Sequence, residues 1–175
     1  EIETRLTELQ NSKAENPEEY WVNATYPEII DHILVRYHQR HREQLQELIV
    51  LADRVESVHG DREDCPIGVA AELRNVYEDL SNHMMKEEHV LFPMIKAGNY
   101  MMAQMPIRMM EMEHAEHGEH LDVLKSLTNN MTPPADACNT WRALYSGIQE
   151  FADDLMMHIH RENNILFPRV IAENH

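Results

Sequence analysis

A histidine and a glutamate recur four residues apart at two places in the chain, and the same short apolar string follows each pair. The two copies read HMMKEEHVLFP over residues 83–93 and HIHRENNILFP over residues 158–168. At that spacing the imidazole and the carboxylate lie on one face of a helix, about 40° apart around the axis and one turn along it. Both groups are common metal ligands, so the repetition indicates two halves of one metal centre.

The ligand types restrict the choice of metal. None of the inward-facing positions carries a cysteine, which excludes a cysteine-rich structural zinc site. A mixture of imidazoles and carboxylates suits iron, manganese or zinc. Because Glu87 and Glu162 occupy equivalent places, each could bridge two metals, and four histidines would then supply two imidazoles per metal. The pattern predicts a dinuclear site with iron as first choice; a structural network of hydrogen-bonded His and Glu is the alternative.

Two further histidine pairs can provide the remaining imidazoles. His38 and His41 stand three residues apart, and His114 and His117 repeat that spacing 76 positions later. Residues three apart lie about 60° apart around a helix, so both members of a pair can face the core. The spacing favours the first member of each pair only weakly, and either member remains a candidate ligand on this criterion alone.

Long amphipathic helices must position these residues. We expect helices over residues 25–57, 67–97, 106–128 and from 132 to about 173. The second helix has a buried stripe of apolar residues at three- and four-residue steps: Val69, Leu73, Val76, Leu80, Val90 and Met94. His83 and Glu87 fill the two gaps in this stripe, and the fourth helix has the same arrangement. The motif therefore faces the core.

Local signals place the helix starts. Thr25 and Glu28 form a capping-box pattern at the first helix, and Thr132 followed by Pro133 predicts the start of the fourth. Four amphipathic helices with short connections are typical of an antiparallel four-helix bundle, so the expected fold class is all-α. The offset of 75 to 76 residues between the two helix pairs predicts a pseudo-twofold axis.

Other polar residues near the motifs are candidates for a supporting role. Asp79 and Asp154 each lie four residues before a motif histidine, and Glu113 is adjacent to His114. Carboxylates at such places orient ligating imidazoles and can relay protons, although solvation is an equal alternative for the two aspartates. The remaining histidines fall outside the stripes or in loops, and we expect them to be solvated: His32, His59, His89, His120, His160 and His175.

Composition limits the function classes. The 175 residues suffice for one domain, and the formal charge of −16 argues against nucleic acid and anionic membranes as partners. No apolar run is long enough to span a membrane, and a homodimer is compatible with the sequence. Cys65 and Cys138 do not form a disulfide framework, so a reducing cytoplasm is expected. The twelve methionines are expected to fill the core rather than bind copper.

The first 24 residues are expected to form an appendage that either docks on the bundle or trails from it. Residues 1–12 have the pattern of a short amphipathic helix, and residues 13–24 read as a linker with Tyr20 and Trp21 as an aromatic anchor. The chain therefore divides into an N-terminal remnant with its linker, residues 1–24, and a metal-binding bundle, residues 25–175.

Several strings around the expected ligands are specific enough to indicate a family. They are IIDH (29–32), YHQRHREQL (37–45), HMMKEE (83–88), LFPMI (91–95), TNN with TPP (128–134) and ENN with LFPR (162–169). On these strings, which span about residues 25–171, the chain resembles the hemerythrin-like domains. The finer match is to the bacterial di-iron "repair of iron centres" proteins.

The resemblance implies a ligand set consisting of His38, His83, Glu87, His114, His158 and Glu162. It also implies two iron ions, bridged by the two glutamates and by an oxo or hydroxo group, and it prefers the first member of each histidine pair. Oxygen-carrying hemerythrins have another histidine four residues after the third-helix ligand, where this chain has Gly118. With fewer imidazoles, each iron would be more open than in a simple oxygen carrier.

The resemblance further implies a cytoplasmic protein of nitrosative and oxidative stress that helps to restore damaged iron–sulfur clusters, with iron supply as the expected activity. Two alternatives are an enzyme that reduces nitric oxide to nitrous oxide, and a sensor or carrier of dioxygen or redox state. Damaged iron–sulfur proteins, nitric oxide and dioxygen are thus the expected partners. Relatives often begin with a small domain that carries adjacent cysteines, and only its last helix, residues 1–12, is expected here.

Overall fold

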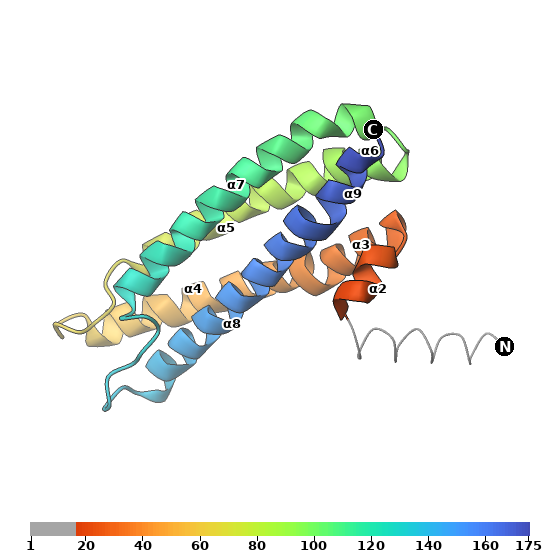
Figure 1. Ribbon diagram of the computed structural model, residues 1–175. Helices are drawn as coiled ribbons and strands as arrows, with labels where there is room; N and C mark the ends of the chain where they lie inside the picture. The colour runs from red at the N-terminus through yellow and green to blue at the C-terminus, as the bar shows by residue number, and fades with distance from the viewer. Residues whose placement is uncertain (1–16) are drawn as a thin grey trace.

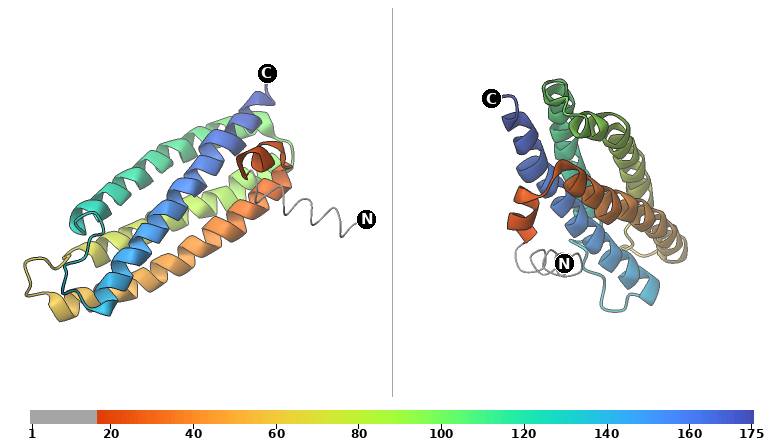
Figure 2. Two further views of the ribbon diagram at one scale, coloured as in Figure 1. Left: turned by 60° about the horizontal axis from the view of Figure 1, so that its bottom comes forward. Right: turned by 90° about the vertical axis from the view of Figure 1, so that its right-hand side faces the viewer.

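The computed structural model describes residues 17–175, which form four antiparallel helical columns (Figure 1). The first column is α3 (Tyr26–His32), η1 (Ile33–Gln39) and α4 (Arg40–His59), and the second is α5 (Val69–Lys86), η2 (Glu87–Leu91) and α6 (Phe92–Lys96). The third is α7 (Tyr100–Leu127), and the fourth is α8 (Asn139–Arg161), η3 (Glu162–Leu166) and α9 (Phe167–Ala172). The columns run side by side in all views (Figure 2), which confirms the predicted all-α bundle.

Three of the columns contain a π-helical segment, and each segment includes or begins at an expected ligand. His38 lies within η1, Glu87 is the first residue of η2, and Glu162 is the first residue of η3. The wider turn inserts one residue into the helix, which is a feature that often accompanies functional sites. The bundle is therefore distorted where the chemistry is expected.

Prolines explain two of these segments. Pro93 and Pro168 are each the second residue after a segment ends, and a proline lacks an N–H and crowds the carbonyl four residues before it. The residues just before them close the wide turn, because the Phe92 N–H donates to the Glu87 carbonyl and the Phe167 N–H donates to the Glu162 carbonyl. The repeated Phe-Pro dipeptide thus sets the local helix geometry at each glutamate.

The π-helical insertion shifts the buried stripe of the second column. Val90 and Met94 were expected to be buried, but Val90 is 45% exposed and Met94 is half-buried. Leu91 and Ile95, one position later, are buried instead. The prediction of the stripe was wrong after Glu87, because a regular period of 3.6 residues takes no account of the extra residue.

Apolar residues form two clusters along the bundle. One cluster joins α4, α5 and α8 through side chains such as Leu73, Leu80 and Phe151. The other surrounds α3, α6 and α9 through side chains such as Ile29 and Phe167. Each fully buried side chain of this size contributes roughly 1.5–3 kcal/mol of hydrophobic stabilisation. The expected ligands belong to neither cluster.

The starts of the last two columns differ from the prediction. Helix α7 begins at Tyr100 rather than near Pro106, which lies inside the helix. Helix α8 begins at Asn139 with Cys138 as its N-cap residue, so the prediction of a start at Thr132 was wrong. Three successive residues with positive φ, Asn129 to Met131, turn the chain sharply, and the Thr132 N–H bonds back to the carbonyls of that turn instead of starting a helix.

The earlier start of α7 also changes the environment of the methionines. Met84 and Met110 are buried as expected, but five others along α7 are more than half exposed: Met101, Met102, Met105, Met109 and Met112. The expectation that the methionines are core residues therefore fails for this helix face. In the described part of the chain, no helix is long and apolar enough to cross a membrane.

The stretch expected as a linker contains a short helix, α2 (Pro17–Asn23). Its Trp21 is buried and stacks on His32 with a ring-centroid distance of 4.0 Å, and Arg169 donates a hydrogen bond to the Trp21 carbonyl. The anchoring role expected for Trp21 is thus visible as a contact between α2 and the bundle. The helix expected over residues 1–12 lies outside the described residues.

His120 was expected to be solvated, but it connects two columns. Its Nδ1 lies 2.6 Å from Glu72 and its Nε2 lies 2.8 Å from Asp79, and both carboxylates are on α5. Burial lowers the pKa of His120, but the two carboxylates outweigh this effect and raise its pKa above the ordinary value. The charged imidazole therefore joins α7 to α5.

This ion-paired histidine predicts a pH-dependent contribution to stability. A raised pKa in the folded state gives stability that is present below the unfolded value and is lost as pH rises through the folded value. We expect His120→Gln to lower the free energy of unfolding by about 0.5 kcal/mol at pH 6 and by much less at pH 9. Urea unfolding at both pH values, with His175→Gln as control, measures this difference; an equal loss at both values would contradict the prediction.

Candidate metal centre

The six expected ligands meet in the interior of the bundle. All are buried, with exposed fractions between 0% and 4%. Their donor atoms form two overlapping groups in which every atom lies within 4.8 Å of the others: His38, Glu87, His158 and Glu162 in one group, and His83, Glu87, His114 and Glu162 in the second. Glu87 and Glu162 are common to both groups, which is the arrangement that a pair of adjacent metals requires.

The contacts of the Nδ1 atoms of two imidazoles determine which tautomer each ring adopts. The Nδ1 of His38 lies 2.7 Å from the Glu88 carboxylate, and the Nδ1 of His114 lies 2.7 Å from the side-chain oxygen of Asn163. Both partners are acceptors, so each Nδ1 must carry the proton and donate it. In the neutral rings the Nε2 atoms then hold lone pairs that face the centre, which is the form that binds metal.

The imidazole nitrogens and carboxylate oxygens that face the centre are too close to be stable without a proton or a metal ion between them. Nε2 of His38 lies 3.2 Å from Oε1 of Glu87, and Nε2 of His114 lies 2.9 Å from Oε1 of Glu162. Lone pairs that approach carboxylate oxygens at such distances repel, unless a proton or a metal ion lies between them. The imidazole Nε2 atoms and the carboxylate oxygens therefore surround positions that a shared proton or metal ion would occupy.

Unpaired oxygens provide a direct test of whether a metal fits. Oε2 of Glu87 and Oε1 of Glu162 are buried, and within residues 17–175 neither has a hydrogen-bond partner of acceptable geometry. A buried carboxylate without partners costs several kcal/mol, and coordination to a metal ion removes this penalty. The donor set of four imidazoles and two carboxylates fits two cations such as iron, manganese or zinc.

Burial controls the protonation of the centre. It lowers the pKa of His83 to about 2, with nearby His114 and His117 acting in the same direction. Burial followed by the neighbouring Glu162 raises the pKa of Glu87 well above its ordinary value. Burial also acts to raise the pKa of Glu162, but His158 and His114 outweigh it and lower that pKa. Burial acts to lower the pKa of His114, but its hydrogen bond to Glu162 outweighs burial and raises that pKa. The His83 imidazole is therefore neutral and ready to ligate, while a free Glu87 would hold its proton until a cation replaced it.

The four ligand imidazoles have different outer partners. His158 contacts His41 through a nitrogen–nitrogen distance of 3.0 Å, and His83 lies 3.4 Å from Glu113. Such partners orient ligating rings and change their basicity. The two shortest contacts, to Glu88 and Asn163, were missed from the sequence, although both residues directly follow a motif glutamate.

The supporting carboxylates agree only partly with expectation. Glu113, expected to support the site from its place next to His114, lies 3.4 Å from the Nδ1 of His83 instead. Asp79 instead bonds to His120, and Asp154 bonds to Arg36 and Gln44. Within the described chain neither aspartate is hydrogen-bonded to His83 or His158, so the orienting role, one of the two equal alternatives for these aspartates, was wrong. Their short side chains are drawn to cationic or amide partners on neighbouring columns instead.

The second members of the histidine pairs lie behind the ligands. His41 and His117 are buried but belong to neither donor group. Phenylalanines cover the other side of the first members, because Phe92 stacks on His38 at 5.7 Å and Phe167 stacks on His114 at 6.1 Å. The Phe-Pro dipeptides therefore hold ligand rings as well as bending the helices.

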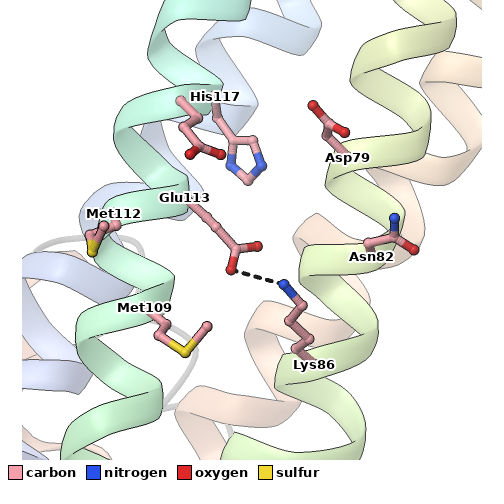
Figure 3. A pocket seen from close by; sticks show the side chains of 8 residues that line it. Asp79, Asn82, Lys86, Met109, Met112, Glu113 and His117 are labelled. Carbon is pink, nitrogen blue, oxygen red and sulfur yellow. Dashed lines mark hydrogen bonds and ion pairs between the residues drawn. The ribbon is translucent and has the colours of Figure 1, made fainter.

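A cleft between α5 and α7 leads toward one side of the centre. It has a volume of about 370 Å³, and its walls carry Asp79, Lys86, Glu113 and His117 (Figure 3). Glu113 extends across the cleft to Lys86, with an oxygen–nitrogen distance of 3.0 Å. Because Glu113 also contacts His83, it joins the cleft to a buried ligand.

Replacement of a shared carboxylate tests the centre. We expect Glu87→Gln to reduce bound metal strongly, because both donor groups lose an anionic ligand. The same change should raise the thermal midpoint of the metal-free protein, since it replaces a buried acid, one oxygen of which has no hydrogen-bond partner, by a neutral amide. Elemental analysis and calorimetry measure the two effects, with the exposed Glu78→Gln as control. Unchanged metal content would contradict the assignment.

Exchange of the outer partners should move metal affinity in opposite directions. Glu88→Gln replaces the anionic acceptor of the His38 imidazole by a neutral one, and we expect about 10- to 100-fold weaker metal binding. Asn163→Asp makes the reverse change at His114 and should strengthen binding. Competition with a chelator measures both affinities. A shift in the same direction for both variants would show that the outer contacts do not act on the ligands.

Comparisons with known proteins agree with this geometry. Residues 29–170 match the family model described as the hemerythrin HHE cation binding domain. The chain is 68% identical over 173 residues to a "probable iron-sulfur cluster repair protein" of Haemophilus influenzae. The aligned region covers 99% of this chain and 78% of that protein. It is 57% identical over 171 residues to the "iron-sulfur cluster repair protein YtfE" of Musicola paradisiaca, covering 97% and 76%. The protein of the same name from Escherichia coli is 55% identical over 174 residues, covering 98% and 79%. With the family's domain spanning all six candidate ligands, the chain belongs to the hemerythrin HHE cation-binding family.

Proposed function

We propose that the protein is a cytoplasmic, non-haem di-iron protein that helps to repair damaged iron–sulfur clusters by supplying iron. Three relatives that are 55% to 68% identical carry names of iron–sulfur cluster repair proteins. The observation that carries the proposal is the pair of donor groups that share Glu87 and Glu162. Two free cysteines are in keeping with a reducing compartment.

Each iron would be held by two imidazoles and both shared carboxylates. His38 and His158 would hold one iron, and His83 and His114 would hold the other. The irons, together with the oxo or hydroxo bridge that the family resemblance implies, would supply exchangeable metal and open positions for small gases. The residues of this chain exclude bulk water from the centre, and burial favours the neutral imidazoles of His38 and His83.

The acidic cleft supports release of iron. The inner ligands are buried, but Glu113 contacts His83 on one side and reaches the cleft on the other. Carboxylates along a cleft attract cations, and the formal charge of −16 acts in the same sense. Transfer to a damaged protein through this side would need only local movement of Glu113 and Lys86.

Reactivation of a damaged cluster enzyme tests this function. The iron-loaded protein should restore activity to an enzyme whose iron–sulfur cluster has lost iron, in anaerobic buffer with sulfide present. The Glu87→Gln variant should fail because it carries less iron, whereas Glu78→Gln should succeed. Equal reactivation by an equivalent amount of free ferrous iron under a competing chelator would contradict a specific donor role.

Reduction of nitric oxide to nitrous oxide is the second candidate. The observation in its favour is that both carboxylates are shared, so two metals would lie side by side and two nitric oxide molecules could meet there. Addition of nitric oxide to the reduced, iron-loaded protein under anaerobic conditions distinguishes the candidates. Nitrous oxide with multiple turnovers would support the enzyme, while a stable nitrosyl adduct without gas release would exclude it. Transport of dioxygen is less favoured, because Gly118 replaces an imidazole of the oxygen carriers.

A further inference from the structure

A second cluster of reactive groups lies at the loop end of the bundle, where α4 ends and α8 begins (Figure 1). The Nε2 of His59 lies 3.2 Å from the Sγ of Cys138. The cysteine is exposed and forms no disulfide. A thiol within reach of an imidazole is the arrangement by which a cysteine is activated as a nucleophile. The metal centre does not use this pair.

The two helices favour charge separation within the pair. Cys138 is the N-cap residue of α8, a helix of 23 residues, and its side chain makes no capping hydrogen bond. The positive end of the helix dipole and the free N–H groups of the first turn therefore stabilise a thiolate there. His59 is the last residue of α4, which has 20 residues, and the negative end of that helix favours an imidazolium. Both helix ends therefore favour transfer of the thiol proton to the imidazole when the sulfur attacks.

Packing holds the imidazole in place. The His59 ring lies against the buried Trp141, with a centroid distance of 5.1 Å. Nearby acidic groups would oppose a thiolate, but Asp64 and Asp136 are both paired with Arg62. The negative charges of these two aspartates are therefore largely balanced by Arg62.

A cavity of about 210 Å³ adjoins the sulfur atom, with walls formed by Arg54, Val55, Val58, His59, Cys138 and Thr140. The valines provide an apolar surface, and Arg54 provides a positive charge. Arg54 is exposed and lines the cavity, so its guanidinium can pair with an anionic ligand. The cavity therefore suits a small molecule that carries both apolar atoms and a carboxylate.

We propose that Cys138 and His59 form a thiol-exchange site for small anionic disulfides of the glutathione type. The Cys138 thiolate attacks one sulfur of the disulfide, forming a protein–ligand S–S bond as the ligand's own S–S bond breaks. The departing thiolate takes the proton held by His59. The disulfide is the oxidant, and one thiol is released for each adduct formed. About 30 Å of α8 separates Cys138 from His158, so the reaction is independent of the metal centre.

Incubation of the purified, metal-loaded protein with oxidised glutathione tests the site. Intact mass and peptide mapping should show one adduct per chain, located on Cys138 and removed by a reducing agent. Cys65 is an internal control, because it is buried and burial raises the pKa of its thiol. Absence of an adduct, or an adduct on Cys65, would overturn the proposal.

Two variants separate the roles of the neighbours. His59→Gln should slow adduct formation about three- to tenfold, because less thiolate is present, whereas His175→Gln at the opposite end of the bundle should not. Arg54→Ala should slow the reaction with oxidised glutathione but not with the uncharged bis(2-hydroxyethyl) disulfide. An unchanged rate for His59→Gln would exclude activation by the imidazole. If Arg54→Ala changes the rate equally with both disulfides, or changes neither rate, the proposal that the ligand is anionic is wrong.

Discussion

The mutual proximity of two buried carboxylates, Glu87 and Glu162, is the constraint on which the centre depends. Both side chains are fully buried, and each has an oxygen without a hydrogen-bond partner in the described part of the chain. Four inward-facing imidazoles surround them but neutralise them only in part, since burial favours the uncharged rings at His38 and His83, whereas contact with Glu162 outweighs burial and raises the pKa of His114. A pair of divalent cations balances this set of groups better than protons do, because each cation also accepts the imidazole lone pairs.

The rest of the bundle positions these two carboxylates. Each glutamate begins a π-helical segment, and a proline six residues later keeps the turn wide. The phenylalanine before that proline then stacks on a ligand imidazole of another column. The repeated apolar string after each glutamate is thus part of the site, since it determines both the direction of the carboxylate and the setting of a facing ring.

The fold was predictable because it depends on repetition, and the same repetition leads to the candidate ligand set, which stays a prediction. The recurrence of His-x-x-x-Glu on apolar stripes requires facing helices, and the resemblance to a known family distinguishes His38 and His114 from their neighbours, which periodicity cannot do. The contacts with Glu88 and Asn163 were not predicted, because they join residues about 50 positions apart and depend on side-chain rotation. The stripe after Glu87 and the roles of Asp79 and Asp154 failed for a related reason: an inserted residue and cross-column ion pairs override regular helical geometry.

The central claim is that two metal ions lie side by side between the shared carboxylates. Anomalous X-ray diffraction from crystals of the iron-loaded protein, collected on both sides of the iron absorption edge, tests it most directly. We expect two iron peaks per chain. One should lie near the Nε2 atoms of His38 and His158 and the other near those of His83 and His114, and both should contact Glu87 and Glu162. A single peak, a peak outside these groups, or a signal only at the zinc edge would contradict it.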